Sequence, residues 1–141
     1  MRNQSLRSLR TGMLLVVMAA FFLLGGCKSK EEALLLRELE YTVLAKENIP
    51  EPLLEELEAR KKEEFRITYE DGEYLYLCVG YGQQDCGGYS IQVKQMSLYE
   101  GYILLDTTLL GPESEDVAQQ VSSYPYLVLR TELLEDPVVF E

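Results

Sequence analysis

Three cysteines are the side chains of this sequence that could carry covalent chemistry, and the chain contains no histidine. The absence of histidine removes every Ser–His or Cys–His nucleophile pair, and with it the commonest general base and metal ligand. Cys27, Cys78 and Cys86 do not form the Cys-x-x-Cys spacing of dithiol redox enzymes. Two uses remain for these thiols: a modification at Cys27, which follows two glycines, and a disulfide between Cys78 and Cys86.

Acidic residues dominate the charge of the chain, with 24 Asp and Glu against 13 Lys and Arg. The net charge of −11 is incompatible with the basic surface that nucleic-acid binding demands, so we predict no nucleic-acid partner. The acidic run 113–116 lacks the alternating oxygen ligands and the glycine of a calcium loop. No pair of carboxylates is marked out by its spacing. We therefore expect no enzyme activity, no metal and no cofactor.

A basic start and a short apolar run open the chain. Three arginines lie among the first ten residues, the apolar run occupies 13–24, and Gly25-Gly26-Cys27 follows it. This order predicts an export signal over residues 1–26. The apolar run is shorter than the roughly 18 to 20 residues that span a bilayer, although an uncleaved membrane anchor remains the alternative.

The end of this signal, Leu24-Gly25-Gly26-Cys27, resembles the lipobox of bacterial lipoproteins, in which an aliphatic residue and two small residues precede an invariant cysteine. The resemblance implies a diacylglyceryl thioether on Cys27 and cleavage between Gly26 and Cys27. Two acyl chains give the stable anchoring that one chain does not. We therefore expect the mature protein to lie on the extracytoplasmic face of the cell membrane, held by its lipid. Its acidic surface either keeps it soluble or faces a basic partner.

The rest of the chain is predicted to form a single domain, 38–141, behind a polar tether at 27–37. A helix is expected from Pro52 to the basic residues 60–62, because early prolines and acids suit a helix start and cations suit its end. Three of its leucines share one face, which we expect to cover a sheet. They are Leu53, Leu54 and Leu57.

From residue 65 onward the pattern has a period of two and is interrupted by turn signals. Asp71-Gly72 is a strong hairpin signal, and Glu100-Gly101 marks a second turn. Regularly spaced short strands predict a mainly β (α+β) fold, a small antiparallel β-sandwich or barrel-like sheet with one packing helix. The expected strands are 40–44, 65–69, 73–79, 89–96, 102–110, 126–131 and 138–140.

Residues 80–89 are the most unusual stretch, because four glycines lie among tyrosines. The stretch is not a dinucleotide-binding fingerprint, since Asp85 stands where the third glycine would be and a strand follows instead of a helix. The glycines either supply a positive φ or a close backbone approach at Gly87-Gly88, or present the backbone to a protein partner.

Cys78 lies near the end of a predicted strand and Cys86 lies in this glycine-rich loop. An export compartment permits a disulfide between them if their Cα atoms approach to about 4.4–6.8 Å. Two free thiols are the alternative, and the sequence does not decide between the two states.

Four short pieces of the second half form a recognisable set: Tyr81-Gly82-Gln83, Gly87-Gly88-Tyr89-Ser90-Ile91, Gly111-Pro112 and Tyr124-Pro125-Tyr126. Together they resemble the C-terminal domain of the protease complex subunit PrcB, over about residues 76–130. The resemblance implies a non-catalytic, often lipid-anchored protein that associates with and stabilises an exported protease. Members of this family commonly carry Pro-Thr-Gly-Gly where this chain has Asp85-Cys86-Gly87-Gly88.

We therefore expect an accessory subunit of an exported protease complex that docks through the glycine-rich loop and the strand after Pro125. The residues expected to make the contact are Gly82, Gln83, Gly87, Gly88, Tyr89, Tyr124, Pro125 and Tyr126.

Two other functions remain open at this stage. Ten tyrosines are many for so short a chain, and they either pack in the core or line a ligand cleft of a solute- or envelope-binding lipoprotein. The cleft would use several of Tyr74, Tyr76, Tyr81, Tyr89 and Tyr102. A small sandwich inhibitor of cysteine proteases also uses glycine-rich loops, but its full motif set is not visible here.

The resemblance to a lipobox can be tested by removing the Cys27 thiol. A Cys27→Ala protein should carry no lipid and should keep residues 1–26, because the thiol is both the lipid acceptor and the mark for cleavage. Metabolic lipid labelling and the mass of the protein test this directly. Lipid labelling that persists in the variant would contradict it.

Overall fold

The computed structural model describes residues 32–114 and 120–141. Several predicted features lie outside these described residues: the predicted signal peptide 1–26, the predicted cleavage site between Gly26 and Cys27, and the predicted lipidation of Cys27. Part of the acidic run 113–116 also lies outside them. Within the described residues, no helix has the length and apolar character needed to cross a bilayer.

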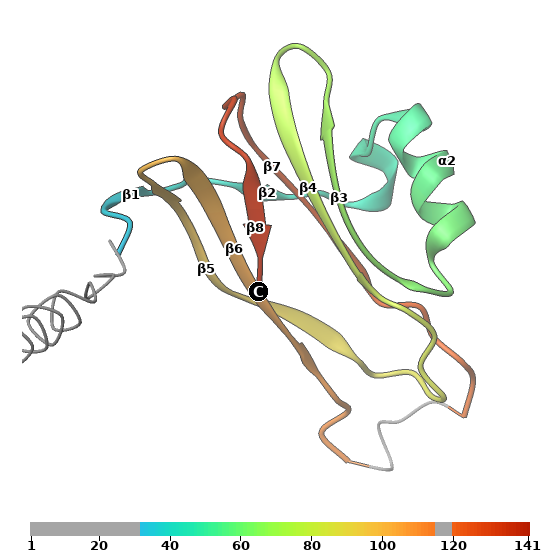
Figure 1. Cartoon of the computed structure of the whole chain (residues 1–141). Coiled ribbons are helices and arrows are strands. Elements are labelled where there is room, and N and C mark those ends of the chain that lie inside the picture. The colour runs from blue at the N-terminus through green and yellow to red at the C-terminus, as the bar shows by residue number, and fades with distance from the viewer. Residues whose placement is uncertain (1–31, 115–119) are drawn as a thin grey trace, which may run out of the picture. The chain divides into compact units, whose positions relative to one another are not determined.

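The unit Ala33–Glu141 consists of two four-stranded sheets and one short helix (Figure 1). This confirms the mainly β prediction. The first sheet has the strand order β1-β5-β6-β8, and the second has the order β2-β7-β4-β3. The strands of the first sheet are β1 (Leu35–Glu38), β5 (Ser90–Tyr99), β6 (Tyr102–Leu110) and β8 (Val138–Phe140). Those of the second are β2 (Thr42–Val43), β3 (Glu64–Glu70), β4 (Tyr74–Tyr81) and β7 (Tyr126–Glu132).

The prediction of a purely antiparallel fold is wrong for one pair of strands. β8 runs parallel to β6, with Val138 opposite Ile103 and Phe140 opposite Leu105. The link 133–137 carries the chain from β7 in the second sheet to β8 in the first. Because this link crosses between sheets and forms no hairpin, the direction of β8 is not tied to a neighbour in sequence.

The N-terminal elements also differ from the sequence prediction. β1 begins at Leu35, inside the segment expected to be a tether, and pairs with the end of β5. The strand expected at 40–44 is only the two residues of β2. The reason is that the chain changes sheets here, with Leu39 buried in the core, and then enters a 3₁₀ turn at Lys46–Asn48.

β4 separates two hydrophobic clusters, because its side chains alternate between them. Leu75, Leu77 and Val79 point into the cluster between the two sheets. Tyr76 and Cys78 point to the opposite face, where the helix packs. The strand is therefore buried on both faces, which explains why its sequence is almost continuously apolar.

The hairpin predicted at Asp71-Gly72 joins β3 and β4. Gly72 has φ +88°, in the left-handed region that glycine reaches without strain. Asp71 Oδ1 accepts hydrogen bonds from the backbone N–H groups of Glu73 and Tyr74, and the Tyr76 hydroxyl donates to Asp71 Oδ2 at 2.6 Å. These bonds lower the pKa of the Asp71 carboxyl, and the bond from Tyr76 has the largest effect. The carboxylate thus closes the turn.

The predicted helix is α2, Glu51–Arg60, and it packs on the outer face of the second sheet (Figure 1). Its leucine stripe behaves as expected: Leu53 and Leu57 are fully buried, and Leu54 is half-buried at the edge of the same cluster. The apolar stripe is therefore used to cover a sheet.

Leu57→Ala should lower the free energy of unfolding by about 2–5 kcal/mol, because it empties a buried site between α2 and the second sheet. Leu54→Ala is the matched control on the same helix and should cost less than half as much. Urea unfolding of the purified full-length chain in mild detergent measures both. Equal losses in the two variants would contradict this packing.

Candidate interaction site

Two loops far apart in sequence meet at one end of the sheets (Figure 1). Gln84 and Ser123 form an isolated antiparallel bridge, in which each backbone N–H donates to the carbonyl of the other residue, at 2.8 and 3.0 Å. The Ser123 hydroxyl also donates to the carbonyl of Cys86 at 2.6 Å. We call residues 82–89 and 120–125 together the loop junction. It unites the two segments that the sequence analysis singled out.

Two glycines of the loop junction have a positive φ, and one of them also lies close to neighbouring backbone. Gly82 has φ +70°, and a Cβ there would lie 3.3 Å from the carbonyl oxygen of Lys62. The neighbouring Gln83 N–H donates to that same oxygen at 3.1 Å, so the loop is bound to the chain just after α2. Gly88 has φ +85° and Gly87 is buried. Of the two predicted uses of glycine at Gly87-Gly88, the positive φ is found at Gly88.

Tyr81 fastens the end of β4 just before the loop junction. Its hydroxyl is 2.8 Å from the hydroxyl of Thr107 on β6, in the other sheet. The guanidinium of Arg66 lies over its ring, 4.8 Å from the centroid. Its backbone N–H donates to the carbonyl of Pro125 at 3.1 Å. Pro125 has no N–H to offer, so its place at the entrance to β7 leaves the ladder intact.

The C-terminal end of α2 positions the two tyrosines of the second segment. The Lys61 ammonium lies 5.4 Å from the centre of the Tyr124 ring. Glu58 accepts hydrogen bonds from Lys46 and Lys61, both at 2.7 Å, and from the Tyr126 hydroxyl at 3.3 Å. The hydrogen bonds from the two ammonium groups lower the pKa of Glu58 to about 2, and the bond from Lys46 has the largest effect. Glu58 therefore stays charged at neutral pH and holds Tyr126 against the helix.

The exposed part of the loop junction is small and mixed in character. Gln83, Asp85 and Gly88 are exposed on the first loop. On the second, Ser122 is exposed and the side chain of Val121 is 69% exposed. Tyr89, Tyr124, Pro125 and Tyr126 are half-buried, so they support the loops more than they project from them. This surface can hydrogen-bond and pack against a partner, and it carries no acid–base pair.

Part of the chain is similar to a known protein family. Residues 75–132 match the family model described as PrcB C-terminal. This segment is a PrcB C-terminal domain. The PrcB C-terminal domain runs from β4 to β7 and contains both loops of the loop junction. The resemblance predicted over 76–130 is confirmed, whereas α2, β1, β2, β3 and β8 lie outside the match. Searches of curated proteins and of solved structures gave no match.

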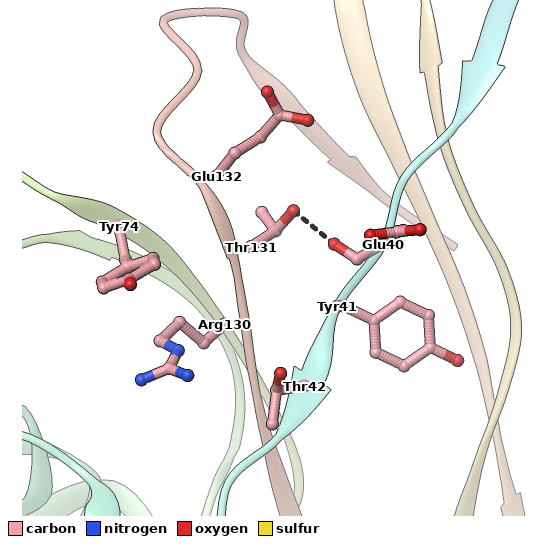
Figure 2. A pocket seen from close by; sticks show the side chains of 7 residues that line it. All are labelled: Glu40, Tyr41, Thr42, Tyr74, Arg130, Thr131 and Glu132. Atoms are coloured by element: carbon pink, nitrogen blue, oxygen red, sulfur yellow. Dashed lines mark hydrogen bonds between the residues drawn. The ribbon is translucent and has the colours of Figure 1, made fainter.

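A shallow hollow of about 320 Å³ lies where β2 approaches the end of the PrcB C-terminal domain (Figure 2). Arg130 lies over the ring of Tyr74, 4.5 Å from its centroid, and Thr131 Oγ1 donates to the carbonyl of Glu40 at 2.7 Å. Of the five tyrosines expected in a ligand cleft, Tyr74 alone lines this hollow. The others are placed elsewhere, with Tyr76 buried in the cluster beneath α2.

The pairing of β2 with β7 creates this hollow, and apart from Tyr74 its lining residues were not predicted from the sequence. The remaining lining residues are Glu40, Tyr41, Thr42, Arg130, Thr131 and Glu132. They carry no motif, because they meet only through pairing between distant strands. Among the residues that the structure describes, no group of three or more Cys, Asp or Glu side chains could hold a metal ion.

The two cysteines of the PrcB C-terminal domain are free thiols in different surroundings. Cys78 is fully buried beneath α2, and burial, with a smaller contribution from the charge of Glu56, raises the pKa of its thiol to about 12. Cys86 is half-buried in the loop junction. A thiol with such a raised pKa is almost entirely protonated at neutral pH and is a poor nucleophile.

A maleimide reagent at pH 7 should therefore label Cys86 in the folded protein and reach Cys78 only after unfolding. Peptide mass spectrometry before and after denaturation identifies the labelled residue. Cys86→Ser is the control and should abolish labelling of every peptide after residue 32 in the folded protein. If neither thiol reacts until a reductant is added, the two cysteines form the disulfide and the free-thiol arrangement is wrong.

Proposed function

We propose that this protein is a non-catalytic accessory subunit of an exported protease, anchored to the extracytoplasmic face of the membrane through Cys27. In this proposal the loop junction binds the protease and stabilises it. The observation that carries the proposal is that both loops of the junction lie within the PrcB C-terminal domain and are bonded to each other.

The hydrogen bonds within the loop junction support a docking role. The Gln84–Ser123 bridge and the bond from Ser123 to Cys86 tie the two loops together before any partner arrives. The bond from Gln83 to Lys62 fixes them to the end of α2. Binding then costs less conformational entropy than it would for two independent loops. A preorganised surface of this kind suits a stable subunit contact.

The side chains of the loop junction support binding more than catalysis. The chain has no histidine, and the exposed side chains on the junction are two amides, a carboxylate, a hydroxyl and an apolar group. Protein interfaces combine such polar groups with a few apolar contacts. A small-molecule site is less well supported, because the hollow at Arg130 is shallow and contains only one of the expected cleft tyrosines.

The proposal is tested by charge reversal on the exposed face of the loop junction. Asp85→Lys should reduce capture of the protease by about tenfold, because a reversed charge at an interface costs on the order of 1.4 kcal/mol. Glu73→Lys is the matched control, an equal charge change on an exposed residue of the β3–β4 turn at the other end of β4. Crosslinking of the full-length protein in its native membrane, followed by quantitative mass spectrometry, measures the capture.

Two results would overturn the proposal. One is a wild-type crosslinking pattern that contains no protease. The other is equal capture of the protease by the Asp85→Lys and Glu73→Lys proteins, which would place the contact elsewhere on the domain. The unfolding midpoint of each variant should match that of the wild type, since both side chains are exposed.

A further inference from the structure

We infer that the outer face of the first sheet, at the end opposite the loop junction, lies against the lipid surface. This inference rests on the proposed anchoring through Cys27. The surface concerned, which we call the apolar tip, consists of Leu35, Tyr99, Tyr102 and Val139 on this face, together with Leu34 and Leu36, which are exposed beside Leu35 at the edge of the sheet.

The apolar tip exposes several large hydrophobic side chains. The three consecutive leucines are 64%, 48% and 54% exposed, and Val139 is 41% exposed. Single exposed apolar residues are common on proteins, but a contiguous group of them marks a contact with a membrane or another protein.

The strand register shows that Leu35, Tyr99 and Tyr102 are neighbours. Leu35 lies opposite Tyr99 across β1 and β5, and Tyr99 lies opposite Tyr102 across β5 and β6. The two tyrosine rings are stacked, with centroids 5.0 Å apart and planes at 1°. The Glu100 N–H donates to the carbonyl of Leu34 at 2.9 Å. The start of β1 is therefore fastened to the β5–β6 turn.

The alternation of side chains places this row on the outer face. Leu98 and Ile103 pack into the cluster between the sheets, so the adjacent Tyr99 and Tyr102 point the other way. On β8, Val138 and Phe140 pack inward, and Val139 therefore points outward. α2 packs on the second sheet, and no other helix of the described residues covers the outer face of the first.

The length of chain between the anchor and the tip identifies lipid as the occupant. Leu34 is seven residues after Cys27, a separation of at most about 25 Å of fully extended chain. β5 runs from Tyr99 at the tip to Ser90 at the loop junction, a distance of roughly 30 Å for a strand of this length. The anchor therefore keeps the tip close to the bilayer, and the loop junction can face outward.

The side chains of the tip suit the boundary between lipid and water. Tyrosine gathers at membrane interfaces, because its ring is apolar and its hydroxyl is polar. The Tyr99 hydroxyl accepts a hydrogen bond from Gln95 Nε2 at 3.0 Å, and the leucines offer apolar area to the acyl boundary. Because Glu38 and Glu100 are exposed beside the tip, the contact relies on apolar burial and not on attraction to anionic headgroups.

The absence of tryptophan from the chain makes a single-tryptophan experiment possible. Leu35→Trp places the probe in the tip, and Leu110→Trp places it at the loop-junction end of β6, where the leucine is 44% exposed against 48% for Leu35. Each full-length protein is reconstituted in phosphatidylcholine vesicles with brominated acyl chains, after its mass shows the lipid on Cys27. The Leu35→Trp emission should fall at least twofold and shift to the blue, while the Leu110→Trp emission should stay unchanged.

A second comparison separates contact from mere closeness to the anchor. Leu34→Ser with Leu36→Ser, added to Leu35→Trp, should restore at least half of the lost emission. Equal emission from Leu35→Trp and Leu110→Trp would overturn the inference, as would quenching that the serines leave unchanged. A blue shift that needs no vesicles and grows with protein concentration would assign the tip to a second copy. Protein without lipid on Cys27 would overturn the anchoring itself, whereas lipidated protein without quenching would overturn only the tip contact.

Discussion

Burial of β4 on both faces is the constraint on which the rest of the structure depends. Leu75, Leu77 and Val79 join the two sheets, while Tyr76 and Cys78 form the floor on which α2 packs. The strand also pairs along its whole length with β3 on one edge and β7 on the other. Loss of its packing would therefore release the helix, the second sheet and the contact between sheets together. A strand in this position has to be apolar on both faces, and this one is.

The same strand connects two features that lie at its opposite ends. One end of β4 is closed by the Asp71 turn, and the other end leads through Tyr81 into the loop junction. β5 returns from the loop junction to the apolar tip, so the loop junction and the tip lie at opposite ends of the first sheet. This arrangement suits the proposed anchoring through Cys27 and the proposed docking through the loop junction, because the partner and the bilayer would then not compete for one surface.

Local features of the fold were predictable because each depends on neighbours in sequence. The leucine stripe of α2, the Asp71-Gly72 hairpin and the positive φ at Gly88 follow from helical periodicity, turn chemistry and the lack of a Cβ. The PrcB C-terminal domain was also recognisable from short motifs. The parallel direction of β8 and the shortness of β2 were not, because each results from the chain crossing between sheets. A segment in which the chain crosses from one sheet to the other has no periodic pattern of apolar residues in its sequence.

The sequence alone determined the strands after residue 65, the helix, the glycine positions and the family of the 75–132 segment. It also contains Leu24-Gly25-Gly26-Cys27, whose resemblance to a lipobox supports the proposed anchoring. Only the tertiary structure decided that Gln84 meets Ser123, that Tyr74 and Arg130 share a hollow, and that Leu35 forms a row with Tyr99 and Tyr102. The physical reason is that backbone conformation is set largely by local sterics and periodicity. Contacts between distant strands depend instead on the register and burial of the whole fold.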